Sequence, residues 1–180
     1  MRRGFEAGAK SVNPNATVSA QYTGWSDSNK AKQQAQAFFE QGIDVILPNV
    51  DAAGKGVFEA VKEYNSSNNS GVRAKSSRSN GAPDVVYTFG ANSDQNANGI
   101  CDDYTLASAV IKVDLAFDRA ISQIRAGKFQ TGLIKEDLAS GIGVTVLNPK
   151  LLGKVIDADT QKLVEDAAKK ITSGEIKLPQ

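Results

Sequence analysis

A run of oxygen-bearing side chains between residues 92 and 103, NSDQNANGICDD, has the spacing of a metal-binding loop. Five residues occupy the first, third and fifth ligand positions, the turn glycine and the ninth position of a calcium loop: Asp94, Asn96, Asn98, Gly99 and Asp102. The twelfth position, where a bidentate glutamate is needed, holds Thr105. Since only one of the first three ligands is charged, the pattern predicts poor calcium affinity, and a plain polar loop without a metal is the favoured interpretation.

The same residues have a second interpretation as a ligand-binding turn at the end of a β-strand. Residues 84–90, DVVYTFG, are rich in strand formers and run directly into Asn92 and Asp94. Ligands of open α/β sheets bind beyond the carboxyl ends of the strands. Under this interpretation Asn92 and Asp94 are hydrogen-bonding groups for a small molecule.

Two other strand-to-helix turns carry candidate ligand-binding side chains. Residues 49–56, NVDAAGKG, place Asn49 and Asp51 before a predicted helix, whose first amides can bind oxygens. The Gly-Lys pair is followed by Gly56 rather than serine or threonine, so the spacing of a nucleoside triphosphate loop is not met. Trp25 follows another predicted strand, where an indole can stack on a flat ring or simply pack over the next helix.

The composition excludes much of enzyme chemistry. The chain has no histidine, so neither a conventional zinc site nor a Ser-His-Asp triad can be assembled, and its one cysteine, Cys101, cannot form an internal disulfide. Lysine and arginine total 21 against 20 acidic residues, so no strong field draws the chain to nucleic acid. The paired acids at 102–103 and 136–137 are expected to be solvated or capping residues. We therefore expect a protein without catalysis or cofactor that binds a small molecule or a protein.

Hydrophobic periodicity predicts strands and helices that alternate around these turns. The predicted strands are 16–22, 44–50, 84–90, 131–136 and 141–147, and the predicted helices are 4–12, 29–41, 54–64, 113–124 and 159–172. This order favours an α/β fold with a layered sheet and right-handed crossovers. Between them, residues 65–83 are small and polar, and are expected to form an exposed, mobile loop.

The length of 180 residues suits one compact unit. No strand precedes the first predicted helix, which suggests that an N-terminal portion is missing. The opening residues, MRRGFEAGAK, lack the apolar run of a secretory signal, and no later segment is apolar for long enough to cross a bilayer.

Several motifs occur in an order that is more specific than any one of them. They are RRGFEAGAKSVNPNATVSAQYTGWSDSNKAKQQAQAFFEQGIDVILPNVDAAGKGVFEAVKE, NSDQ, ASAVIKVDLAFDRAI, GKFQTG and ITSGEIKLP, and together they cover nearly the whole chain except residues 65–83. This series resembles the basic membrane protein family of bacterial lipoproteins, which contains purine nucleoside receptor A and related substrate-binding proteins of ABC transporters.

The resemblance implies a three-layer lobe of the type I periplasmic-binding-protein fold with a mainly parallel sheet. In that fold two lobes joined by a hinge hold a nucleoside between them. The chain is similar to the C-terminal half, without the first lobe, the signal peptide or the lipid-bearing cysteine. Residues 1–110 would form an α/β unit with the 65–83 insertion, and residues 111–180 the crossing segment and closing elements of the same unit. Cys101 is internal, so it cannot be the residue that anchors family members to the membrane at the cell surface or in the periplasm.

Two positions depart from the family pattern. Family members have VDSDQ where this chain has ANSDQ, so Asn92 replaces an acid that accepts hydrogen bonds from ribose hydroxyls. An amide still accepts, but it loses the charge-assisted bond, worth about 1–2 kcal/mol more than a neutral one. Ile111 replaces the lysine of the S-x-x-K-x-V-D stretch, and Lys112 follows one place later. The candidate ligand-binding residues are Trp25, Asn49, Asp51, Asn92 and Asp94.

These features predict a solute-binding protein, or a fragment of one, that binds a nucleoside-like small molecule for an ABC transporter permease. The alternative is a degenerate lobe that acts as a protein-interaction or regulatory module without a ligand. An uncovered sheet edge or apolar crossing segment would favour pairing, so a homodimer is a further expectation.

Overall fold

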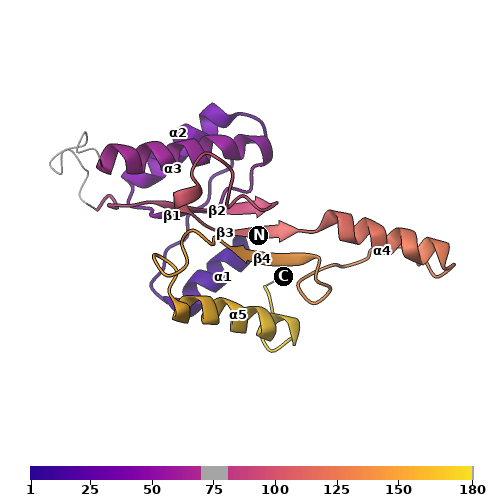
Figure 1. Ribbon diagram of the computed structural model, residues 1–180. Helices are drawn as coiled ribbons and strands as arrows, with labels where there is room; N and C mark the ends of the chain where they lie inside the picture. The colour runs from indigo at the N-terminus through magenta and orange to yellow at the C-terminus, as the bar shows by residue number, and fades with distance from the viewer. Residues whose placement is uncertain (70–80, 180) are drawn as a thin grey trace.

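A four-stranded sheet forms the centre of the protein in a computed structural model that describes residues 1–69 and 81–179 (Figure 1). Its strands are β1 (Val45–Ile46), β2 (Tyr87–Asn92), β3 (Thr105–Ile111) and β4 (Gly143–Leu147), in the spatial order β1-β2-β3-β4. The first three strands are parallel, and β4 runs antiparallel to β3. The predicted α/β fold with a mainly parallel sheet is therefore confirmed.

Two helices, α2 (Ser28–Glu40) and α3 (Gly54–Asn69), cover one face of the sheet (Figure 1). The Asp27 carboxylate caps α2 by accepting a hydrogen bond from the Lys30 amide at 2.9 Å. The apolar side of each helix is buried against the other, and the rings of Phe39 and Tyr64 meet with their centroids 5.0 Å apart. Burial of this shared apolar surface holds the layer together.

The two helices approach each other closely at Gly56. A Cβ atom at this position would overlap the carbonyl oxygen of Ser28, at the start of α2. Glycine is therefore required for the close backbone contact, although it lowers the intrinsic stability of a helix.

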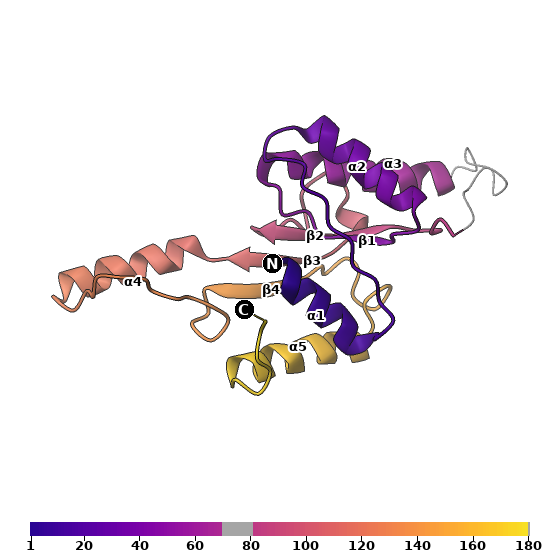
Figure 2. The same cartoon turned by 180° about the vertical axis from the view of Figure 1, so that it is seen from behind.

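The other face of the sheet is covered by α1 (Arg2–Val12) and α5 (Ala158–Thr172) (Figures 1 and 2). Phe5 of α1 meets Phe89 of β2 edge to face, with ring centroids 6.0 Å apart. Asp157 caps α5 through a 2.7 Å hydrogen bond from the Thr160 amide. Helices on both faces of the sheet give the expected three layers.

Helix α4 (Val113–Arg125) continues from β3 and extends away from the sheet (Figures 1 and 2). Four apolar residues on it are between 45% and 64% exposed: Val113, Phe117, Ile121 and Ile124. Arg119 ties the helix to the segment before β4 by donating to the Ser140 carbonyl oxygen at 2.6 Å. Neither α4 nor any other helix within the described ranges is long and apolar enough to cross a bilayer.

Two predicted strands are wrong. Residues 16–22 have no regular secondary structure and are not part of the described sheet. They belong to the connection that carries the chain from α1 on one face to α2 on the other (Figure 2). Residues 131–136 also form no strand. Alternation of residue types makes an extended conformation favourable, but a strand also needs a neighbouring strand to accept and donate its backbone hydrogen bonds.

The polar stretch 65–83 begins differently from the expected loop. Helix α3 continues to Asn69, and the side chain of Asn65 is only 1% exposed. Asn65 is buried because its amide has two backbone partners at Val86. Residues 70–80 of the predicted mobile loop lie outside the described residues.

Candidate functional site

The carboxyl ends of β1, β2 and β3 lie along one edge of the sheet because these strands are parallel. Asn92 is the last residue of β2 and pairs with Val110 of β3, and Asp94 follows two residues later. Asn49 and Asp51 follow β1. All four candidate polar residues are exposed at or beyond these strand ends, and we call them the carboxyl-edge residues.

Two of the carboxyl-edge residues have unusual backbone conformations. Asp51 has a φ of 48° and Asn92 a φ of 69°, and no other non-glycine residue within the described ranges has a positive φ. Such conformations are uncommon outside glycine and often occur at functional sites. At Asn92 the chain turns sharply out of the strand, and the Ser93 amide donates to the Ala91 carbonyl oxygen at 2.9 Å. Both side chains are thus presented from tight turns rather than from regular strands.

Trp25 is adjacent to the turn that contains Asp51. The carbonyl oxygen of Trp25 accepts a hydrogen bond from the Ala53 amide at 3.0 Å, which joins the two segments. The indole is 67% exposed. A large apolar ring left mostly in water beside a polar turn is suited to stack on a flat ligand.

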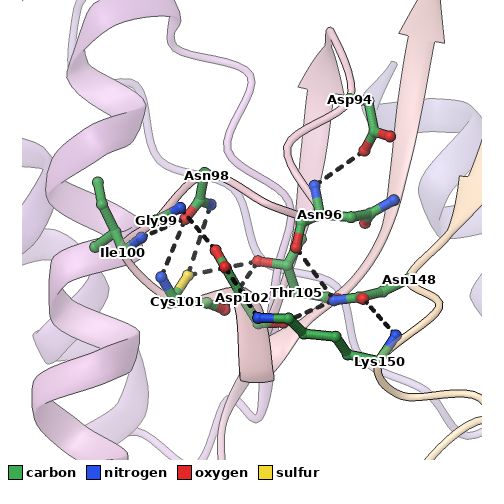
Figure 3. A network of polar contacts seen from close by, with 10 residues as sticks. All are labelled: Asp94, Asn96, Asn98, Gly99, Ile100, Cys101, Asp102, Thr105, Asn148 and Lys150. Atoms are coloured by element: carbon green, nitrogen blue, oxygen red, sulfur yellow. Dashed lines mark hydrogen bonds and ion pairs between the residues drawn. The ribbon is translucent and has the colours of Figure 1, made fainter.

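The loop from residue 93 to 104 uses its side-chain oxygens to bind its own backbone (Figure 3). The Asn98 Oδ1 atom accepts from the amides of Ile100 and Cys101 at 2.8 and 3.0 Å. The Asp102 Oδ1 atom accepts from the Gly99 amide at 2.7 Å. These are the local turn contacts that Asn and Asp side chains commonly make.

The remaining oxygens of the calcium pattern point elsewhere. Asn96 is buried, its Oδ1 atom accepts from the Ser108 hydroxyl at 3.2 Å, and its Nδ2 atom donates to the Val146 carbonyl oxygen at 2.9 Å. Asp94 lies apart from Asn98 and Asp102 (Figure 3). Within the described residues no group of three or more acidic, histidine or cysteine side chains could hold a metal ion. The spacing that resembles a calcium loop instead builds a hydrogen-bonded turn.

Asp102 is the carboxylate with the most partners in this loop. Its Oδ2 atom lies 3.1 Å from the Lys150 ammonium, whereas Oδ1 caps Gly99. Desolvation opposes its ionisation, but the hydrogen bonds from Lys150 and from the Gly99 amide outweigh that effect and lower the pKa of Asp102. Burial raises the pKa of the neighbouring Cys101 thiol, so this cysteine is a poor nucleophile at neutral pH.

Two hollows in the described surface lie at the other end of this loop. One, of about 290 Å³, is lined by residues 99–104 together with Lys62, Ser66 and Lys150. The other adjoins it along α3, between Glu59 and Ser67. None of the five candidate ligand-binding residues lines either hollow. The carboxyl-edge residues and Trp25 are therefore exposed outside these two hollows.

Sequence reasoning missed two buried residues that bind the 93–104 loop. Ser108 and Asn148 are buried polar residues of β3 and of the turn after β4, and both donate hydrogen bonds to residues of the 93–104 loop. Gly90, inside β2, could have indicated that another segment lies against this strand, because glycine within a strand often marks such a close approach. A Cβ atom there would lie 2.8 Å from the Gln95 Cβ atom.

Two curated relatives match almost the whole chain. The CD4+ T-cell-stimulating antigen of Listeria innocua is 29% identical over 185 residues, which are 98% of this chain and 47% of that protein. The ABC transporter nucleoside-binding protein BmpA of Lactococcus lactis is 29% identical over 186 residues, which are 98% of this chain and 48% of that protein. The chain thus spans about half the length of the curated relatives it matches.

A solved structure shares the fold. The solute-binding protein of an ABC transporter system from Conexibacter woesei superposes with a TM-score of 0.69 at 23% identity, over 98% of this chain and 51% of that chain. The likeness confirms the predicted solute-binding-protein lobe as a fold. A family model, described as ABC transporter substrate-binding protein PnrA-like, matches residues 1–180. The chain therefore belongs to the PnrA-like family of ABC transporter substrate-binding proteins.

Proposed function

We propose that the carboxyl-edge residues and Trp25 form one wall of a binding site for a nucleoside-like solute of an ABC transporter. The observation that carries the proposal is the gathering of exposed hydrogen-bonding groups at the carboxyl ends of parallel strands, two of them in left-handed turns. Family membership supports a substrate-binding role, and the Lactococcus lactis relative is named as a nucleoside-binding protein.

The residue types suit the two parts of a nucleoside. Asn92 and Asp94 offer oxygens that accept hydrogen bonds from ribose hydroxyls, and Asn49 and Asp51 offer further polar contacts. The exposed indole of Trp25 provides a surface on which a base can stack. These are non-covalent contacts, so the proposed role is capture and release rather than a reaction.

The exposure of these residues sets an expectation for affinity. A nucleoside on this surface would keep one side in water, and water competes with every hydrogen bond it makes. We therefore expect weak binding by the 180-residue chain and tighter binding where a second wall covers the ligand. Delivery to a permease is a proposal for a protein of the full family length.

Calorimetric titration of the chain with adenosine, guanosine and uridine tests the proposal. Asn92→Asp should strengthen binding about tenfold, because a charge-assisted bond replaces a neutral one. Asn92→Ala and Trp25→Ala should each weaken it. Gln123→Glu adds the same charge on exposed α4 and should leave the affinity unchanged.

Two results would contradict this function. Absence of heat and of any thermal shift with all three nucleosides at millimolar concentration would exclude nucleoside binding by this chain. Equal effects of Asn92→Asp and Gln123→Glu would show that the added charge acts through the overall field rather than at a site. Chromatography after overnight incubation would detect turnover, which the proposed role does not include.

A second role as an interaction module is favoured by one observation, the exposed apolar stripe on α4. We propose a second copy of the chain as its partner, since pairing of two such stripes removes both from water. Sedimentation equilibrium should show a dimer that Phe117→Ser weakens. Val12→Ser, which also replaces an exposed apolar residue but on α1, should leave the dimer intact.

A further inference from the structure

Ser108 lies in the sheet beneath the loop that carries Asp94. In the strand register it is opposite Gly90 of β2 and opposite Val146 of β4, and it is completely buried. Its hydroxyl oxygen accepts a hydrogen bond from the Gln95 amide at 2.9 Å, and its proton is donated to the Asn96 Oδ1 atom at 3.2 Å. One buried hydroxyl thus binds the backbone and a side chain of the same loop.

The surroundings of Ser108 are shaped to admit the loop. A Cβ atom at Gly90 would overlap the Ser108 hydroxyl and crowd Gln95, so glycine at this position leaves room for both. Asn96 has one possible orientation of its amide in this setting. Its Nδ2 atom donates to the Val146 carbonyl oxygen, which leaves Oδ1 to accept from Ser108.

These contacts reach the carboxyl-edge residues directly. The Asn96 amide donates to the Asp94 Oδ1 atom at 3.0 Å, so the place of the Asp94 carboxylate depends on where Asn96 is held. The Gln95 Nε2 atom donates to the Ala91 carbonyl oxygen at 3.3 Å and spans the turn at Asn92. The hydrogen bonds of Gln95 and Asn96 therefore reach both candidate ligand-binding residues of this loop. We call the two hydrogen bonds of the Ser108 hydroxyl, to Gln95 and to Asn96, the Ser108 tie.

We infer that Ser108 and Asn96 are positioning residues that hold Asn92 and Asp94 in the conformation that binds the ligand. The inference rests on the function proposed above. Both residues are buried, Ser108 at 0% and Asn96 at 4% exposure, so they act through the loop rather than by touching a ligand. A site whose polar groups are held before binding loses less conformational freedom when the ligand arrives.

The test compares Ser108→Ala with Thr105→Val. Thr105 is also a completely buried hydroxyl on β3, but it donates to the Cys101 carbonyl oxygen, away from residues 92–96. Ser108→Ala should speed hydrogen exchange of the Gln95 amide about tenfold, as one hydrogen bond is lost, and should weaken adenosine binding about tenfold. Thr105→Val should leave both quantities at the wild-type value, even if the two variants lose similar stability.

The two readouts separate the inference from the proposed function. If hydrogen exchange of the Gln95 amide is unchanged in Ser108→Ala, the Ser108 tie does not hold the loop. The inference is then overturned, whatever the binding result. Faster exchange with unchanged adenosine affinity would overturn the positioning role and leave nucleoside binding intact. If the wild-type chain binds no nucleoside, the proposed function and the positioning role fall together. Should Ser108→Ala not fold, Asn96→Ala removes the hydrogen bonds of the Asn96 side chain to Ser108 and Val146 from the loop side and should also weaken adenosine binding. Unchanged adenosine affinity in Asn96→Ala would overturn the positioning role.

Discussion

Asn65 and Val86 exchange two hydrogen bonds. The Asn65 Nδ2 atom donates to the Val86 carbonyl oxygen at 2.8 Å, and the Val86 amide donates to the Asn65 Oδ1 atom at 2.9 Å. Both residues are buried, and Val86 immediately precedes β2. A side-chain amide on α3 thus takes the place that a neighbouring strand would have at this point of the sheet.

Removal of the Asn65 side-chain amide should destabilise the folded protein. Asn65→Ala leaves a buried amide and a buried carbonyl group at Val86 without partners, so we expect the free energy of unfolding to fall by about 2–4 kcal/mol. Asn68→Ala is the matched control, since Asn68 donates one exposed hydrogen bond to the Asp84 carbonyl oxygen. Urea denaturation measures both changes, and equal losses would contradict the special role of Asn65.

Alanine substitutions at two helical glycines should change the stability of the protein in opposite directions. Gly56→Ala places a Cβ atom against the Ser28 carbonyl oxygen, and we expect a loss of about 1–3 kcal/mol in the free energy of unfolding. Gly8 of α1 has no atom within 4 Å of such a Cβ, so Gly8→Ala should gain about 0.5–1 kcal/mol from helix propensity alone. Thermal unfolding distinguishes them, and a stabilised Gly56→Ala would show that the helices can separate freely.

Stability in acid should depend on Asp102. Its pKa is lowered in the folded chain relative to its ordinary value of 3.8, so the folded state binds this proton less tightly than the unfolded state. The contribution is fully present above that value and is lost as the pH falls through the folded pKa. Asp102→Asn should therefore lower stability near neutral pH and flatten the acid limb of the stability curve. A constant difference between wild type and variant down to pH 2 would contradict this assignment.

Calcium should have no effect on stability at millimolar concentration. The oxygens of the 93–104 loop are engaged with backbone groups and with Lys150, and they do not converge on one point. The midpoint of thermal unfolding should move by less than about 1 °C between calcium and chelator. A rise of several degrees with calcium, absent with magnesium, would require the loop to rearrange around an ion.

The helices were the most predictable part of the fold. Apolar residues at helical spacing placed five helices close to their observed bounds. The end of α3 was missed because residues 65–69 are polar. The Asn65 side chain contacts Val86, 21 residues further along the chain, and a contact of this kind leaves no local pattern in the sequence.

The strands were harder to predict because sheet pairing is non-local. β3 was missed altogether, since Ala107, Ser108 and Ala109 are small residues with little preference for a strand. Of these three residues, Ser108 forms hydrogen bonds with the 93–104 loop. The prediction for residues 16–22 failed for the opposite reason. The segment has the composition of a strand, but it pairs with no strand of the described sheet.

The candidate site was predictable in part. Parallel strands followed by polar turns allowed the carboxyl-edge residues to be chosen, and the structure places all four at or beyond the ends of β1 and β2. Their roles in binding stay predictions. The contacts of Ser108 with the loop could not be foreseen, because they depend on the register between β2, β3 and β4.

The extension of α4 from the body has a consequence for how the protein unfolds. An isolated helix of 13 residues is only marginally stable in water, and the Arg119 contacts connect α4 to a connecting segment rather than to the core. For the chain on its own, α4 is expected to melt at a lower temperature than the sheet and the α2–α3 layer. Loss of circular dichroism should then begin before the tertiary signal of the core changes. The 180-residue chain would lose its structure in two cooperative units rather than one.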